Sequence, residues 1–237
     1  MMRCKLQHSL KVRLKHAIPP GLLNAVLLRF PFLYQTKLVF YETTLLTAGG
    51  IDELLSQLVT VLNVEGEIIE CGSSRCGASI IMAKYLQTQG VNKKILACDS
   101  FEGFDRAELK QEQKARLTTA TNKSFTSTSY QYVQKKIAAL GFQNAVIPVK
   151  GYFRDTLPNL SGPFCLGLID CDLRESLVYA AEAIWPKLST GGCLLFDDYH
   201  SPEFKGAKQG VDIFVKKHLA EISEHGLLNR LYYVRKV

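Results

Sequence analysis

The sequence predicts a doubly wound α/β fold built on a mostly parallel sheet. Short apolar runs alternate with helical segments of about 10–15 residues, the order that produces parallel strands. The runs Cys165–Ile169 and Cys193–Phe196 are apolar throughout, which is typical of strands covered on both faces. Acidic residues and glycines follow four of the runs, where open parallel sheets bind ligands. The 237 residues suffice for one such domain with a substantial core.

Residues 1–50 are expected to form a helical extension, and residues 51–237 the domain itself. Residues 3–16 contain five arginines and lysines and no acidic residue. The apolar stretch 22–33 follows, interrupted by Arg29 and Pro31. We expect a helical cap or lid there rather than a signal peptide. Interfacial membrane contact by the basic segment is the alternative, while the lack of a long uncharged apolar span argues against a transmembrane helix.

The elements of the domain follow from the apolar periodicity. Strands are expected at Glu67–Cys71, Lys94–Cys98, Ala145–Val149, Phe164–Ile169, Cys193–Phe196 and, closing the chain, Leu228–Val234. Helices are expected at Ile51–Leu62, Ser79–Leu86, Ser127–Leu140, Leu173–Leu188 and Val211–Ile222. Gly191 and Gly192 are expected to form the turn into the fifth strand. The polar segment 105–123 is expected to be either a solvated helix and loop or a mobile lid.

The positions of the cysteines indicate the redox compartment of the protein, and its net charge raises the question of a nucleic-acid substrate. The seven cysteines form no C-x-x-C pair, and most fall in predicted strands, where a free cysteine behaves as a small buried hydrophobe. A reduced, cytoplasmic protein is therefore expected. The net charge is +7, but no motif that reads RNA or DNA is present, so nucleic acid is not expected as a substrate.

The glycine turn after the first predicted strand is compatible with three classes of cofactor. Gly72 and Gly77 have the spacing of a phosphate-binding loop, but Ala78 stands where the phosphate-neutralising lysine belongs. A dinucleotide is the second alternative, because Asp99 lies at a suitable distance to hold ribose hydroxyls. The G-x-G-x-x-G turn is missing, however, and Glu70 would repel a diphosphate.

S-adenosylmethionine explains both acidic residues best. It has a ribose, which Asp99 can bind through the hydroxyls, and it has no phosphate. Its methionine end carries an ammonium and a sulfonium, which a carboxylate at Glu70 would attract. We therefore favour S-adenosylmethionine over the two phosphate-containing alternatives.

Aspartates follow the fourth and fifth strands, at Asp170, Asp172, Asp197 and Asp198. Clustered carboxylates repel one another unless a cation lies between them. Carboxylate oxygens suit Mg²⁺, which indicates a divalent metal at this edge. The alternative is that Asp172 and Asp198 cap the elements that follow them. His200 is a candidate general base because histidine titrates near neutral pH.

Four segments together resemble the macrocin O-methyltransferase (TylF-like) family of class I methyltransferases. They read GEIIECGSSRCGASIIMAKYL, ACDSFEGF, VKGYFRDTLP and LIDCDLRESLVYAAEAIWPKLSTGGCLLFDDYH. The resemblance runs from about residue 40 to residue 215 with the motifs in the family's order. Members act on sugar hydroxyls of antibiotics and similar natural products, which implies a Rossmann-like fold and O-methyl transfer here.

The resemblance also implies roles for individual residues. The methionine end of the cofactor would be surrounded by Glu70, Gly72, Ser73, Gly77 and Ser79, with Asp170 nearby. The ribose and adenosine would lie against Asp99, Ser100 and Phe101, and the adenine against Gly151, Tyr152 and Phe153. The family's Mg²⁺ ligands match Asp170, Asp197 and Asp198, and its general base matches Asp172.

The sequence thus predicts a metal-assisted O-methyltransferase whose acceptor is a hydroxyl of a sugar-like small molecule. An N-methyltransferase or a catechol-type O-methyltransferase on the same fold is the first alternative. A non-catalytic binding module that keeps the cofactor fold is the second. Aromatic residues of the extension, among them Phe30 and Tyr41, are candidates to line the acceptor pocket. The family resemblance also implies a homodimer.

Overall fold

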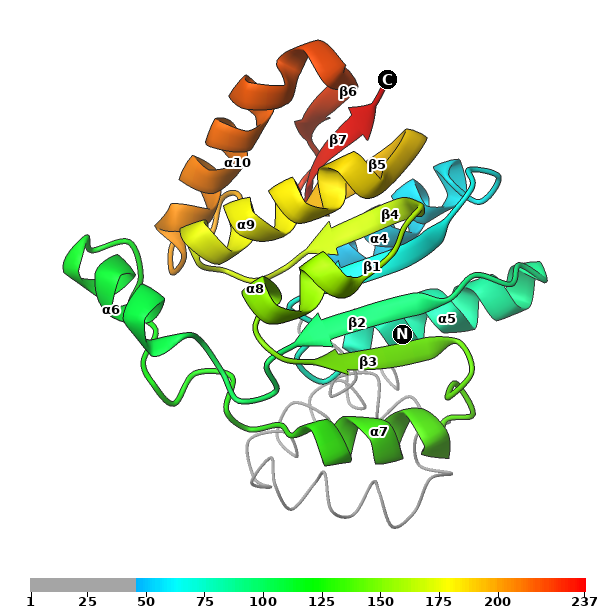
Figure 1. Cartoon of the computed structure of the whole chain (residues 1–237), viewed down its shortest axis with the longest axis horizontal. Coiled ribbons are helices and arrows are strands. Elements are labelled where there is room, and N and C mark those ends of the chain that lie inside the picture. The colour runs from blue at the N-terminus through cyan, green and yellow to red at the C-terminus, as the bar shows by residue number, and fades with distance from the viewer. Residues whose placement is uncertain (1–45) are drawn as a thin grey trace, which may run out of the picture.

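A seven-stranded sheet forms the centre of the computed structural model, which describes residues 46–237 (Figure 1). The strand order is β3-β2-β1-β4-β5-β7-β6. The strands are β1 (Glu67–Cys71), β2 (Ile95–Asp99), β3 (Val146–Lys150), β4 (Phe164–Ile169), β5 (Leu188–Phe196), β6 (Ile222–Leu227) and β7 (Tyr232–Lys236). The first five are parallel, while β7 pairs antiparallel with both β5 and β6. The predicted doubly wound, mostly parallel fold is confirmed.

Helices cover both faces of the sheet (Figure 1). They are α4 (Ala48–Thr60), α5 (Gly77–Gln89), α6 (Arg106–Lys114), α7 (Tyr130–Ala139), α8 (Phe153–Thr156), α9 (Arg174–Ile184) and α10 (Lys205–His218), with short 3₁₀ helices at Leu157–Asn159, Trp185–Lys187 and Leu219–Glu221. Successive residues of a strand point to opposite faces. Ile68 and Leu168 therefore pack in the cluster with α4, α5 and α7, and Ile69 and Ile169 in the cluster with α9 and α10.

The strands with continuous apolar runs match their predictions most closely. β1 and β4 have the expected bounds, and β2 and β3 begin and end one residue later than expected. The fifth strand is wrong at its start, because Gly191 and Gly192 lie inside β5 rather than in a turn before it. Within residues 46–237, every helix is too short or too polar to span a bilayer.

The carboxyl-terminal part differs most from its prediction. The last helix, α10, begins at Lys205 and ends at His218, several residues before the expected span. Two strands follow it where one was expected, and Leu228 lies in the turn between them. The extension up to residue 45 lies outside the described residues, so the cap, the basic segment and the aromatic pocket residues proposed there stay predictions.

The polar segment 105–123 forms α6 and a loop, and α6 is tied to the start of α9. Asp105 caps α6 by accepting hydrogen bonds from two of its first amides. Glu108 accepts the amide of Ser176 at 2.7 Å and also its hydroxyl. Glu112 accepts the amide of Arg174 at 3.3 Å. These glutamates therefore accept hydrogen bonds from backbone amides at the amino end of α9 that have no partner within the helix. The alternative that Asp172 caps this helix is wrong, because Leu173 occupies the cap position.

Candidate active site

A cavity of about 560 Å³ opens at the carboxyl ends of the parallel strands. It lies where the fold class predicts a ligand. Most of the predicted site residues line it: Glu70, Gly72, Ser73, Gly77, Asp99, Ser100, Gly151, Tyr152, Phe153, Asp170, Asp172, Asp197 and Asp198. Ser79, Phe101 and His200 are absent from the cavity wall. One cavity thus brings together both ends of the predicted site, the glycine turn and the aspartates.

Gly72 lets the turn after β1 approach the end of β4. Its φ is +92°, a conformation that only glycine adopts readily. A Cβ atom there would lie 1.8 Å from the carbonyl oxygen of Asp170. The Gly72 amide donates to Cys98 at the end of β2, so the turn is attached to both neighbouring strands. A side chain at this position would therefore displace the backbone that carries the aspartates.

Glu70 is the most deeply buried acidic group at the end of the cavity formed by the glycine turn, with 2% of its surface exposed. The Ser79 hydroxyl donates to its carboxylate, which explains why Ser79 lies behind the wall. Burial raises the pKa of Glu70 to about 7, and the hydrogen bonds from Ser79 only partly oppose this effect. Glu70 therefore changes charge near neutral pH, and a bound cation would favour its ionised form.

Asp99, at the end of β2, fixes the loops that surround it. Its carboxylate accepts the amide of Ser74 at 2.8 Å and that of Phe101 at 2.6 Å. Burial raises its pKa, an effect that these two hydrogen bonds oppose. Phe101 itself is buried against Tyr130, with ring centroids 5.6 Å apart, rather than facing the cavity.

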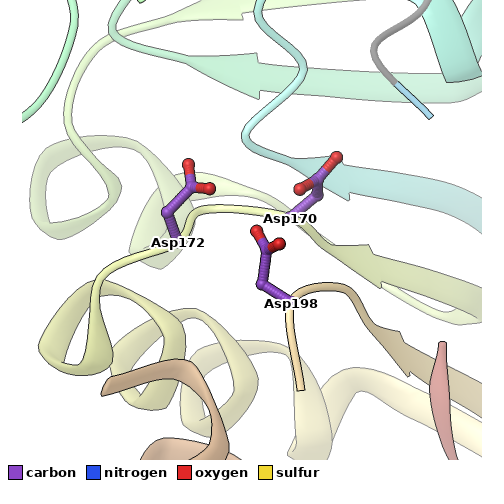
Figure 2. Close-up of side chains that lie close together, drawn as sticks. All are labelled: Asp170, Asp172 and Asp198. Atoms are coloured by element: carbon purple, nitrogen blue, oxygen red, sulfur yellow. The ribbon is translucent and has the colours of Figure 1, made fainter. Parts of the chain in front are cut away.

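Three aspartates converge at the other end of the cavity. Figure 2 shows the carboxylates of Asp170, Asp172 and Asp198 facing a common centre from the ends of β4 and β5. One ligand oxygen from each lies within 4.8 Å of the others. Asp172 and Asp198 have φ values of +65° and +60°, a region that aspartate tolerates better than most residues.

Asp197, predicted as a metal ligand with Asp170 and Asp198, is not among the three aspartates whose oxygens lie within 4.8 Å of one another. Its two carboxylate oxygens accept hydrogen bonds of 2.6 Å each from Nε and Nη2 of Arg230. Arg230 comes from the turn between β6 and β7 and was not identified from the sequence. No local pattern marks it, because its partner is 33 residues away in the chain. The set within metal-ligand distance contains Asp172 instead of Asp197.

The aspartate cluster has the chemistry of a site for a hard divalent cation. Burial raises the pKa of Asp170, Asp172 and Asp198, and repulsion from neighbouring aspartates raises the first two further. Oxygen-only donors at this spacing suit Mg²⁺. A cation between the carboxylates would relieve their repulsion and favour their ionised forms. The donor set therefore fits the metal that the sequence predicts.

Neither the candidate base His200 nor the cysteine thiols near the aspartates lie in suitable surroundings for proton transfer or nucleophilic attack. His200 is exposed and packs its ring against Tyr199, with centroids 5.0 Å apart. Burial raises the pKa of the Cys71 and Cys171 thiols well above their usual range, so neither is a thiolate near neutral pH. Asp172 is the candidate base that faces the cavity.

Aromatic rings form part of the cavity wall beside the aspartates. Phe104, Phe125 and Phe204 all line it and pack on one another, with centroids 5.2–6.4 Å apart. Phe104 precedes α6, Phe125 lies in the loop between α6 and α7, and Phe204 precedes α10. This wall comes from the domain itself and was missed in the sequence, because its three members lie in segments without apolar periodicity.

Comparisons with known proteins agree with this architecture. The structure of the O-methyltransferase NovP superposes with a TM-score of 0.67, covering 82% of each chain at 24% identity, which is a likeness of fold. A tetracenomycin 4'-O-methyltransferase of Streptomyces olivaceus, whose substrate is named as 8-demethyl-8-(2,3-dimethoxy-alpha-L-rhamnosyl)-tetracenomycin C, is 30% identical over 162 residues. Demethyldecarbamoylnovobiocin O-methyltransferase of Streptomyces niveus is 30% identical over 143 residues.

These two sequence matches cover 66% and 58% of this chain, and 62% and 54% of the respective relatives. The chain thus spans less than two thirds of the length of either relative. The family model for macrocin O-methyltransferase (TylF) matches residues 48–225, which includes every strand from β1 to β5 and all the predicted site residues that line the cavity. The chain therefore belongs to the macrocin O-methyltransferase (TylF) family.

Proposed function

We propose that this protein is an S-adenosylmethionine-dependent O-methyltransferase that methylates a hydroxyl of a sugar-like natural product. The observation that carries the proposal is the single cavity with Glu70 and Asp99 at one end and three aspartates at the other. The relatives support it, since both are named as O-methyltransferases and the first as acting on a rhamnosyl-tetracenomycin. We further propose that a divalent cation, Mg²⁺, binds at the aspartates.

The cofactor end of the cavity supplies complementary charge. S-adenosylmethionine, when bound, would supply a methyl group on a positively charged sulfur. Glu70 in its ionised form would stabilise the positive charge of the methionine end. Asp99 is held by the amides of Ser74 and Phe101, and its remaining lone pairs would accept hydrogen bonds from the ribose hydroxyls. Gly72 lets the turn after β1 pack against the backbone of Asp170, which keeps the two ends of the cavity adjacent.

The acceptor end combines a base with groups that orient the hydroxyl. The cation, when bound, would lower the pKa of the acceptor hydroxyl and fix its position. Asp170 and Asp198 would hold it, with Asp172 contributing one carboxylate oxygen. The second oxygen of Asp172 would accept the acceptor proton. The aromatic wall of Phe104, Phe125 and Phe204 would exclude water and align the acceptor with the methyl group, which accounts for much of the rate enhancement in such displacements.

The alternatives make different demands on the same residues. An N-methyltransferase would methylate amines, which a panel of matched amino and hydroxyl acceptors distinguishes. In a non-catalytic binding module, replacement of Asp170 by asparagine would leave the function of the protein unchanged. A homodimer, expected from the family resemblance, remains part of the proposal.

The charge of Glu70 provides a test of the cofactor assignment. We expect S-adenosylhomocysteine, which carries the same ammonium group, to bind about 10-fold more tightly at pH 8 than at pH 6, because the ionised fraction of a group with pKa about 7 rises by about that factor. Titration calorimetry at several pH values measures this dependence. In Glu70→Gln the affinity should be nearly constant over the same range.

Two outcomes would count against the cofactor assignment. Binding that weakens as the pH rises would mean that the ligand does not require ionised Glu70. Absence of binding at every pH would reject S-adenosylmethionine as the cofactor. Lys84→Gln, an exposed change on α5, serves as the control and should retain the pH dependence of the wild type.

A further inference from the structure

Arg230 differs from the other cavity residues because its positively charged side chain already forms an ion pair with one of the four aspartates, Asp197. Its guanidinium forms a two-bond fork with Asp197, of which 2% is exposed. Such bidentate pairs are among the stronger charge-assisted contacts. The Nη2 atom of Arg230 also lies 3.9 Å from Asp198, so its charge reaches the edge of the cluster.

Several contacts hold Arg230 in this position. The buried carboxylate of Glu53, on α4, accepts the amides of Asn229, Arg230 and Leu231 at 2.8–3.2 Å. Burial would raise the pKa of Glu53, but these backbone hydrogen bonds outweigh it and lower the pKa below its usual value. Gly50, also on α4, leaves room for the Arg230 stem, since a Cβ there would lie 3.1 Å from Arg230 Cδ.

The hydrogen bonds from this turn to Glu53 therefore hold Arg230 in position beside Asp197. The carboxylate of Asp197 and the guanidinium of Arg230 together have no net charge. Within the described part of the chain, Asp170 and Asp172 have no basic side chain within ion-pair distance, and Asp198 has only Arg230, at 3.9 Å. Of two adjacent aspartates at the end of β5, one is thus neutralised by the protein and the other is left for a ligand.

We propose that Arg230 is a positioning residue that withholds Asp197 from the metal site, so that a divalent cation binds to Asp170, Asp172 and Asp198. This inference rests on the proposed metal site and specifies its ligands. It differs from the ligand set that the family resemblance implies, in which Asp197 binds the metal directly. The positive charge of Arg230 also limits cation affinity, because it lies close to the same oxygens.

A charge-balanced double variant separates the two ligand sets. Asp197→Asn with Arg230→Gln removes the ion pair without changing the net charge of the site. We expect its affinity for Mn²⁺, measured by titration calorimetry, to stay within about 3-fold of the wild type, because no ligand is lost. Asp170→Asn should weaken Mn²⁺ binding by at least about 10-fold, because it removes a ligand and its charge.

The single variant Arg230→Gln tests whether the positive charge of Arg230 lowers the affinity of the site for a divalent cation. It leaves Asp197 ionised and unpaired beside the site, and we expect Mn²⁺ to bind about 10-fold more tightly. This gain should disappear in the double variant. Arg230→Lys keeps the charge and should retain affinity close to the wild type, so the inference can be tested even if Arg230→Gln fails to fold. Thermal unfolding of each variant checks that the fold is intact.

The outcomes distinguish this inference from the proposed function. If the double variant loses as much Mn²⁺ affinity as Asp170→Asn, Asp197 is a ligand and the inference is overturned, while the metal site stands. If the wild type and Asp170→Asn both fail to bind Mn²⁺, the proposed metal site is itself rejected. Binding of S-adenosylhomocysteine to the same variants reports separately on the cofactor assignment.

Discussion

Replacing Asp172 by asparagine is expected to lower kcat for methyl transfer by about 10²–10⁴-fold, the usual contribution of a general base. The variant keeps the size of the side chain and one oxygen atom for the proposed metal site, and it removes the capacity of the side chain to accept a proton. Affinity for S-adenosylhomocysteine should change by less than about 3-fold, since Glu70 and Asp99, the residues proposed to bind the cofactor, lie at the other end of the cavity. Steady-state kinetics with labelled S-adenosylmethionine and an active acceptor measures the effect.

His200→Ala is the matched control for this prediction. His200 is the other candidate base suggested by the sequence, but it is exposed and does not line the cavity. Its removal should leave kcat within about 3-fold of the wild type. A large loss of kcat in His200→Ala, together with normal turnover in Asp172→Asn, would reverse the assignment of the base.

Gly72→Ala is expected to destabilise the protein by about 4 kcal/mol, lowering Tm by roughly 8–16 °C for a chain of this size. The added Cβ would lie 1.8 Å from one backbone atom of Asp170 and 2.5 Å from another. No flexible side chain can move to relieve this overlap, so the ends of β1 and β4 must separate. Thermal unfolding followed by circular dichroism measures the change.

Gly90→Ala isolates the backbone contribution to this effect. Gly90 caps α5 with a φ of +66°, and a Cβ there meets no atom within 4 Å. Its substitution should cost only about 1–2 kcal/mol, the usual penalty for a left-handed conformation. If Gly72→Ala is no less stable than Gly90→Ala, the close approach of β1 and β4 does not constrain the site as described.

The sequence predicted the parts of the fold that local pattern determines. β1 and β4 were located to the residue because buried parallel strands are apolar throughout and end at glycine or acidic residues. β6 was missed because it lies at the edge of the sheet, where Ser223, Glu224 and His225 face solvent and break the apolar run. The end of α9 was overestimated because Pro186 converts the last turn into a 3₁₀ helix.

The site was predictable in its location but not in its pairings. Glu70, Asp99 and Asp170 follow strands, so the topology alone places them at one edge. The pairing of Asp197 with Arg230 depends on a turn between two strands that the sequence pattern did not resolve. The contacts of Glu108 and Glu112 with α9 likewise join residues more than sixty positions apart. Side-chain partners of this kind are determined by tertiary packing, which periodicity does not encode.

Methyl transfer to a sugar-like hydroxyl can be measured directly in one assay. The protein would be incubated with Mg²⁺, labelled S-adenosylmethionine and a panel of rhamnosylated natural products, each paired with the same compound methylated at its sugar hydroxyls. We expect label in at least one free-hydroxyl compound, none in its methylated counterpart, and loss of the signal in Asp170→Asn. Label transferred equally to both members of a pair, or undiminished in Asp170→Asn, would contradict this expectation.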